Sequence, residues 1–176
     1  MIRKFVLTLA LLAGAPCLLN LSVASASEPV RVAFSPGNAE SVVVAVIGEA
    51  KTSVLMAAYS FTSRPIAQAL LEAQQRGVHI FVIGDAEQAS KSYSSFNYLA
   101  NHKINVRLNS SFQSMHNKFM VIDNTIIQTG SFNYTAAAAK KNAENIVVID
   151  DKKTAEKFSS YWKQLYETSA PLKPRY

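Results

Sequence analysis

The stretch HNKFMVIDNTIIQTGSFN, residues 116–133, decides how the fold of this chain is interpreted. It contains two apolar runs, 119–122 and 125–129, with the length and β-branched content of sheet strands. The Asp123-Asn124 pair between them is typical of a hairpin turn. A buried hairpin has no structural need for the imidazole, ammonium and small polar groups that flank it, so those groups are candidates for chemistry.

The polar residues at the start of the hairpin suit a bound anion. Residues two apart on a strand share one face about 7 Å apart, so we expect the side chains of His116 and Lys118 to point the same way. We expect Met120 on that face and Phe119 and Val121 on the other, which makes one face chemical and the other structural. Lysine neutralises an anion, while histidine acts as nucleophile or general acid. No metal site is expected, because the ammonium repels a metal ion and no ligand cluster accompanies the pair.

The residues after the second run complete this pattern. Gly130, Ser131 and Asn133 offer a close backbone approach, a hydroxyl and an amide, which are groups suited to phosphate oxygens. Each piece has an ordinary explanation by itself: a surface histidine, an edge lysine, a turn. The combination at fixed spacing is what indicates a site.

The rest of the chain alternates short apolar runs with amphipathic stretches. Strands are expected at 30–34, 53–58, 78–83, 106–108 and 145–149. Helices are expected at 42–50, 63–77, within 89–101 and at 158–166, with Pro171 and Pro174 in a terminal tail. The strand–helix–strand order of 53–83 predicts a parallel βαβ unit. The expected fold class is therefore α/β, a mixed β-sheet sandwiched between helices, with its first half parallel.

The N-terminal segment has the pattern of a secretory signal peptide over residues 1–26. A basic start, an apolar run and the small residues Ala24-Ser25-Ala26 follow one another. An uncleaved anchor is a weaker interpretation, because Pro16 and Asn20 interrupt an apolar stretch already short for a span. A lipoprotein starting at Cys17 is disfavoured by the preceding proline. Residues 27–176 are then expected to form a single domain.

Net charge indicates which partners the chain can bind, and cysteine content indicates how its domain is stabilised. The full chain carries a net charge of +6, and removal of Arg3 and Lys4 with the leader leaves +4. A basic surface is compatible with nucleic acid or anionic lipid. The single cysteine, Cys17, lies in the leader, so the remaining domain is expected to be stabilised by an ordinary core without disulfides.

The motif resembles the signature of the phospholipase D superfamily, H-x-K-x4-D, then six residues, then G-S-x-N. Every spacing is met by His116, Lys118, Asp123, Gly130, Ser131 and Asn133. A compact α/β domain behind a signal peptide is similar to the small secreted bacterial endonucleases of that superfamily. The resemblance implies a phospholipase D-like fold.

The resemblance also implies roles for these residues, with no metal and no cofactor. One motif histidine attacks phosphorus and a second protonates the leaving oxygen. Lys118 and Asn133 are then expected to hold the non-bridging oxygens, and Ser131 to orient or donate. Asp123 is expected to hold the turn. Glu144 is expected to orient the catalytic histidine by accepting its hydrogen bond, although a solvated acid at a strand start is nearly as good an explanation.

This chain holds only one copy of a motif that the superfamily needs twice. The histidines of His79-Ile80-Phe81 and His102-Lys103-Ile104 lack the lysine two positions on. A homodimer that contributes one His116 from each chain to a shared site is therefore expected.

Nucleic acid is the expected substrate, cleaved without sequence preference, as DNA or RNA. The domain is basic and lacks the long insertions that would shape a lipid pocket. The cations expected to line the mouth of the site are Lys91, Arg107, Lys140, Lys141, Lys152 and Lys153. The alternatives are a secreted phospholipase D and a non-catalytic nucleic-acid-binding protein. The leader indicates a periplasmic or secreted protein with no stable membrane association after its removal.

Overall fold

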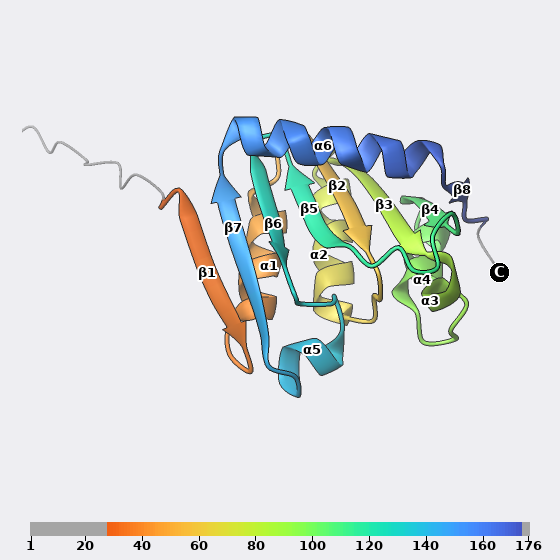
Figure 1. The fold of residues 1–176 in the computed structure, drawn as a ribbon, viewed down its shortest axis with the longest axis horizontal. Helices are drawn as coiled ribbons and strands as arrows, with labels where there is room; N and C mark the ends of the chain where they lie inside the picture. Colours follow the sequence, from red (N-terminus) through yellow and green to blue (C-terminus); the bar gives the residue numbers. More distant parts are fainter. Residues whose placement is uncertain (1–27, 174–176) are drawn as a thin grey trace, which may run out of the picture.

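The computed structural model describes residues 28–173. The predicted leader, residues 1–26 with Cys17, lies outside the described residues. The described chain forms one eight-stranded mixed sheet with helices on both faces (Figure 1), which confirms the expected fold class.

The sheet has the strand order β1-β7-β6-β5-β2-β3-β4-β8. The strands are β1 (Val30–Ser35), β2 (Ser53–Ala58), β3 (His79–Asp85), β4 (Asn105–Asn109), β5 (Lys118–Ile122), β6 (Ile126–Gly130), β7 (Glu144–Asp150) and β8 (Ala170–Pro171). The strands β2, β3 and β4 are parallel neighbours, and the other pairings are antiparallel. The expectation of a parallel first half was wrong for β1, which pairs antiparallel with β7 far from β2. It was also wrong to treat Pro171 as tail, since it pairs with Arg107.

The helices cover the sheet unequally. They are α1 (Ala39–Glu49), α2 (Arg64–Gln75), α3 (Ala86–Ala89), α4 (Ser95–Asn101), α5 (Ala136–Lys140) and α6 (Lys152–Glu167). The helices α1 and α2 lie behind the sheet in the view of Figure 1, while α6 crosses one end of the opposite face. Of the helices that the structure describes, none has the length and apolar character needed to span a membrane.

Local sequence explains where the principal helices begin. The Ser63 hydroxyl accepts from the backbone N–H of Ile66 at the start of α2, and Pro65 occupies the first turn, where no N–H is needed. Asp151 caps α6 in the same way through the N–H of Thr154.

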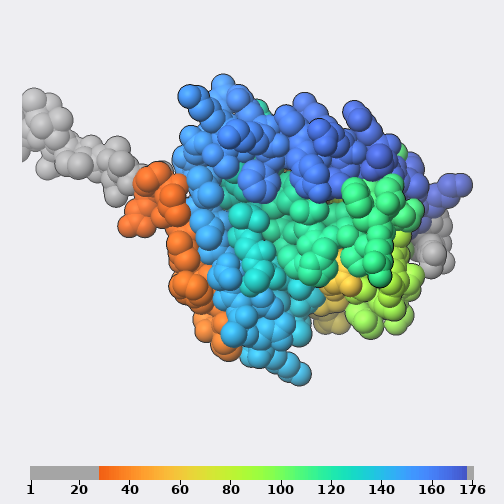
Figure 2. All heavy atoms as spheres, in the orientation of Figure 1, coloured from red at the N-terminus to blue at the C-terminus, as the bar shows by residue number. Residues whose placement is uncertain are grey.

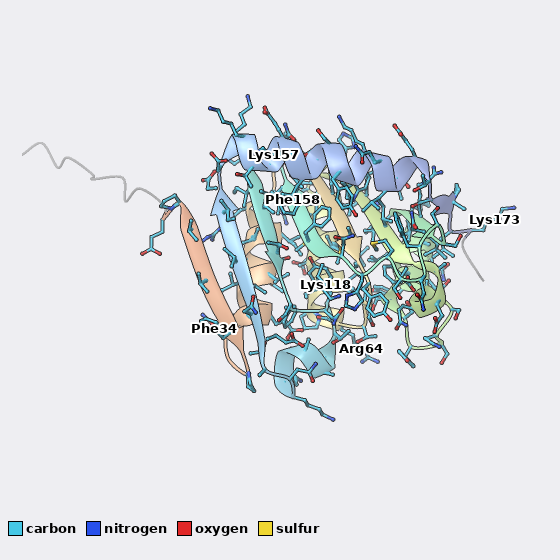
Figure 3. The ribbon with its side chains drawn as sticks, viewed as in Figure 1. Phe34, Arg64, Lys118, Lys157, Phe158 and Lys173 are labelled. Atoms are coloured by element: carbon cyan, nitrogen blue, oxygen red, sulfur yellow. The ribbon has the colours of Figure 1, made fainter. Side chains whose placement is uncertain are left out.

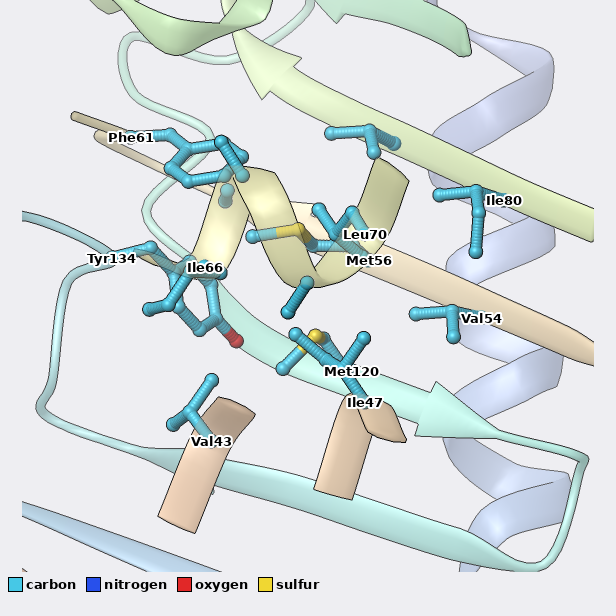
Figure 4. Packing of buried hydrophobic residues seen from close by; sticks show 14 of the residues in the cluster. Val43, Ile47, Val54, Met56, Phe61, Ile66, Leu70, Ile80, Met120 and Tyr134 are labelled. Carbon is cyan, nitrogen blue, oxygen red and sulfur yellow. The ribbon is translucent and has the colours of Figure 1, made fainter. Parts of the chain in front are cut away.

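The core lies on both faces of the sheet, and β5 is buried on both. Met120 belongs to the cluster under α1 and α2 (Figure 4), while Phe119 and Val121 belong to the cluster under α6. Every residue of β5 is buried. The alternation predicted for this strand is therefore correct, but the division into a chemical and a structural face is wrong. Only the end of the strand at Lys118 is free for chemistry.

The β5–β6 connection is the predicted hairpin. Asp123 and Asn124 have φ angles of 51° and 56°, and the Thr125 N–H donates to the Ile122 carbonyl. Two positive φ angles define the type I′ turn, which fits the twist of paired strands, and Asp and Asn tolerate this conformation better than most residues.

At the other end of the hairpin Gly130 is required by a close approach. A Cβ atom there would lie 2.2 Å from the Asn145 carbonyl oxygen of β7, and its φ is +149°. The sequence predicted such an approach toward a ligand, whereas the structure uses it for strand pairing.

One edge of the sheet collects the motif residues. The strands β2, β3, β4 and β6 end at this edge, and β5 and β7 begin there (Figure 1). We call it the site edge. The short helix α5, which the sequence did not predict, also lies there.

Replacement of Gly130 by alanine should lower the free energy of unfolding by about 3 kcal/mol or more, because the methyl group meets backbone and the conformation is strained. Gly48 in α1 is the matched control: its Cβ would meet nothing within 4 Å, so Gly48→Ala should raise stability by about 0.5–1 kcal/mol. Urea denaturation measures both. Equal stability of Gly130→Ala and the wild type would contradict the packing described.

Candidate active site

His116, Lys118 and Tyr59 form a compact cluster at the site edge. The Lys118 Nζ lies 3.1 Å from the His116 Nδ1 and donates to the His116 carbonyl oxygen at 2.8 Å. The Tyr59 ring lies beside the imidazole, with centroids 4.4 Å apart, and 5.0 Å from the ammonium. His116 is exposed and Lys118 only 8% exposed. The prediction that the two side chains point the same way is confirmed.

This contact fixes which imidazole nitrogen faces outward as a donor. A charged ammonium has no lone pair, so it must donate to Nδ1, and the proton of a neutral imidazole then resides on Nε2. Burial lowers the pKa of Lys118 from its ordinary value, and the negative charge of Glu144 opposes that shift. A bound anion would supply the countercharge that burial makes favourable.

Ser131 and Glu144 form a second cluster next to the first. The Ser131 hydroxyl donates to the Glu144 carboxylate at 2.5 Å and accepts from the Asn145 N–H at 3.1 Å. The Asn142 amide donates to the other oxygen of Glu144 at 3.0 Å. The expectation that Glu144 accepts a hydrogen bond from His116 is not met within one chain over residues 28–173. The carboxylate faces Ser131 because β7 begins directly beside the end of β6.

Asn133 keeps its side-chain amide unused. Its Oδ1 is buried without a hydrogen-bond partner among the described residues, while its backbone carbonyl accepts from Thr135. A buried polar atom without a partner is uncommon and requires an explanation. The unpartnered atom is an acceptor, so a ligand group that donates a hydrogen bond would satisfy it.

The motif aspartate lies away from this chemistry. Asp123 sits at the opposite end of β5, where its carboxylate accepts from the N–H groups of Lys51, Thr52 and Ser53 and from the Thr52 hydroxyl. Burial alone would raise the pKa of Asp123, but these hydrogen bonds lower it below the ordinary value. Asp123 was expected to hold the turn. Its carboxylate fixes the segment before β2 and the start of that strand, which is also a structural role.

Two residues that position the site were missed from the sequence. Tyr59 directly follows β2, and the buried Asp85 ends β3, where it accepts from the N–H groups of Met115 and Gln88. Polar residues that directly follow buried parallel strands are a known signal for a site. That signal was present in the sequence at both positions.

The six cations expected at the mouth of the site divide into two groups. Lys91, Lys140 and Lys141 lie on segments at the site edge. The other three do not. Arg107 donates to the Ser169 carbonyl and lies over the Tyr166 ring, and Lys152 and Lys153 begin α6 at the far end of β7. The expectation was wrong for those three, because spacing along the chain does not reveal the sheet edge to which a residue belongs.

The composition of the site suits anion chemistry rather than metal binding. Across the part of the chain that the structure describes, no group of three or more His, Cys, Asp or Glu residues is placed to hold a metal ion. The clustered groups are an imidazole, an ammonium, an amide and a hydroxyl–carboxylate pair. They can bind a phosphate, attack it and transfer a proton.

Comparisons with known proteins agree with this composition. A family model described as "Cardiolipin synthase, PLD-like domain" matches residues 43–166. "Phospholipase D" of Rickettsia conorii is 34% identical over 143 residues, which are 81% of this chain and 72% of that protein. The crystal structure of the phospholipase D family member Nuc from Salmonella typhimurium superposes with a TM-score of 0.80 at 40% identity, covering 82% of this chain and 97% of that one. NucT from Helicobacter pylori superposes with a TM-score of 0.76 at 28% identity, covering 81% and 98%.

Replacement of Asp123 by asparagine should destabilise the protein near pH 7 by about 1–2 kcal/mol through loss of the charged hydrogen bonds. Because the folded pKa of Asp123 is depressed, its contribution is present above the unfolded value of about 4 and is lost as pH falls through the folded pKa. Urea denaturation at several pH values should show the wild type and the variant converging in acid. A difference that stays constant down to about pH 3 would contradict the assigned role.

Proposed function

This chain belongs to the phospholipase D superfamily of hydrolases that act on phosphodiester bonds, and from that premise we propose that it is a metal-independent endonuclease. Its substrate is DNA or RNA, cut without sequence preference, and its active site is shared by two chains. The predicted leader, residues 1–26, supports a location in the periplasm or outside the cell.

The contact between Lys118 and His116 carries this proposal. A nearly buried ammonium held 3.1 Å from an exposed imidazole combines an anion-binding charge with a reactive nitrogen. Ser131 and Asn133 stand at the same edge. The Ser131 hydroxyl must turn from Glu144 to donate to a phosphate oxygen, and the NH2 group is the donor of the Asn133 amide. These are the groups that a tetrahedral phosphate needs around it.

The proposed reaction has two displacements. The Nε2 of one neutral His116 attacks phosphorus, the bond to the leaving oxygen breaks, and the partner's His116, present as the imidazolium, donates its Nε2 proton to that oxygen and becomes neutral. Water then attacks phosphorus, gives a proton to the partner's His116, and the P–N bond breaks. The attacking imidazole needs its proton on Nδ1, so binding of phosphate must draw Lys118 from Nδ1 to a phosphate oxygen. The two imidazoles therefore work in opposite protonation states.

The cations at the site edge support nucleic acid as the substrate. Lys91, Lys140 and Lys141 lie on its segments together with the exposed Arg64 (Figure 3), and cations along a path track a phosphate backbone. The competing function is hydrolysis of a phospholipid, which the name of the Rickettsia relative favours. Both reactions use the same phosphodiester chemistry, so a direct assay must decide between them.

An uncovered apolar strip supports the dimer. Val30, Val32 and Phe34 of β1 are 48%, 54% and 61% exposed. They lie on the face that α6 crosses, because their neighbour Ala33 and the opposed Ile146 pack on the α1 side. The surface over β1 and β7 beyond α6 is open in Figure 2.

This strip runs to the site edge. Phe34 pairs with Asn145, whose N–H donates to Ser131. Contiguous exposed apolar surface marks an interaction site, and a strip ending beside half of an active site fits a second copy that brings the other half.

The nuclease proposal predicts that purified protein nicks plasmid DNA in excess chelator, while His116→Ala loses about 1,000-fold or more in rate because the nucleophile is gone. Gel electrophoresis of the plasmid follows the cutting, and release of headgroup from phosphatidylglycerol vesicles follows lipid turnover. Turnover of lipid without cutting of DNA or RNA would select the phospholipase. A strict requirement for a divalent metal would contradict the phosphohistidine route.

The shared site predicts a nonlinear loss of activity in mixed dimers. Wild type and His116→Ala chains, co-refolded in equal amounts, should retain about one quarter of the wild-type activity, because only dimers with two intact chains work. Independent sites would retain about one half.

Phe34→Glu should give monomers in sedimentation analysis with little activity, whereas Lys157→Glu, on the outer surface of α6, should remain dimeric. An active monomer would overturn the dimer proposal.

A further inference from the structure

A groove runs across the site edge beside the catalytic cluster. Its larger part has a volume of about 720 Å³ and lies between the start of α2 and α4, lined by residues that include Arg64, Gln68, Tyr93 and Tyr98. A smaller hollow of about 210 Å³ continues toward α5 and Lys140. Arg64 lines both parts, so the two hollows follow one path.

The groove shares its wall with the catalytic cluster. Thr62 lines both hollows and follows Tyr59, which contacts His116, by three residues. An extended chain covers at most about 3.6 Å per residue, so the backbones of Tyr59 and Thr62 lie within about 11 Å. The Thr62 N–H also donates to the Tyr134 carbonyl, next to Asn133. A ligand held at His116 is therefore adjacent to this groove.

Two tyrosine rings stand open in the groove. Tyr93 is 68% exposed and Tyr98 43% exposed. The Tyr98 ring is braced by His102, with ring centroids 4.3 Å apart. Exposed aromatic rings that line a groove provide surfaces on which unpaired bases stack, and such stacking is tolerant of sequence.

The cation in the groove is available for a ligand. Arg64 is exposed, and its guanidinium has neither an ion pair nor a hydrogen bond among the described residues. Its side chain extends outward below Lys118 in Figure 3. A guanidinium suits a phosphate, which it can bind through two parallel hydrogen bonds.

We propose that this groove is a binding subsite for a single-stranded nucleic-acid segment next to the scissile phosphate. Tyr93 and Tyr98 stack on unpaired bases, and Arg64 and Lys140 contact the backbone. The proposal rests on the nuclease function proposed above and adds a strand preference to it. A base within a duplex is already stacked and cannot lie on a tyrosine ring, so the groove selects unpaired strand. An acyl chain is a poorer occupant, because it would leave the guanidinium of Arg64, which lines both hollows, without an anionic partner.

Binding is tested in the His116→Ala background, so that the strand is not cut. Fluorescence anisotropy would follow a labelled oligonucleotide of about 12 residues. Tyr93→Ala and Tyr98→Ala should each weaken single-strand binding about 5- to 30-fold and change binding of the matching blunt duplex by less than about twofold. Tyr93→Phe keeps the ring and should bind single strands as tightly as the His116→Ala parent does.

Arg64→Ala should reduce the slope of log affinity against log salt by about 0.7, the contribution of one phosphate contact. Lys157→Ala, on the outer surface of α6, should leave single-strand affinity unchanged.

The possible outcomes separate this proposal from the function on which it rests. Thermal melting identifies any variant that has lost its fold, and Tyr93→Phe and Arg64→Ala still test the groove if Tyr98→Ala unfolds. Unchanged single-strand affinity in folded Tyr93→Ala, or equal weakening for duplex, would overturn the subsite. Loss of phosphatidylglycerol vesicle binding without loss of oligonucleotide binding would assign the groove to lipid instead. If the wild type hydrolyses neither nucleic acid nor a small chromogenic phosphodiester, the nuclease proposal is overturned. The binding measurements do not depend on hydrolysis, so they test the groove separately.

Discussion

The constraint on which this structure depends is the burial of an ammonium group at the end of a central strand. Lys118 opens β5, whose residues are all buried, and a charge there is costly unless it finds partners. The partners are the carbonyl and Nδ1 of His116 and the face of Tyr59. Each of them is held by a neighbouring element. Tyr59 follows β2 and donates its N–H to the Asn117 carbonyl, and the loop before His116 is tied to Asp85 through Met115. Removing water from the cation thus also positions the reactive imidazole.

The strand β5 joins this chemistry to the rest of the sheet. Its other end holds Asp123, which accepts hydrogen bonds from three successive backbone N–H groups before and at the start of β2. Because β2 and β5 are antiparallel neighbours, fixing one end of the pair sets the register at the other, where Ala58 faces Lys118. The aspartate of the motif therefore acts on the site through the sheet, because it lies at the opposite end of β5 from Lys118 and His116. Gly130 has a similar role for β6 and β7, since its lack of a side chain lets Ser131 reach Glu144.

Two further features, an apolar surface and a groove, lie at the same edge of the sheet as the catalytic cluster. Apolar surface on β1 ends beside Ser131, and the groove with Arg64 and Tyr93 begins beside Tyr59. The first suits a second chain, and the second suits a strand of substrate. In the proposed arrangement, a second chain would complete the site on the side of β1, and the substrate strand would lie in the groove beside Tyr59.

The sequence by itself determined the motif, the hairpin and the alternation of strands and helices, because these depend on short-range spacing and on local conformational preference. The turn at Asp123 and the shared direction of the His116 and Lys118 side chains were predicted correctly for this reason. Only the tertiary structure decided that β1 lies beside β7, that β5 is buried on both faces, and that Glu144 binds Ser131 instead of His116 within one chain. It also decided that Lys152 and Lys153 stand at the far edge, while Tyr59 completes the cluster. Those facts depend on which strands become neighbours and on the direction in which each runs, and long-range pairing leaves no periodic signal in the residues that take part.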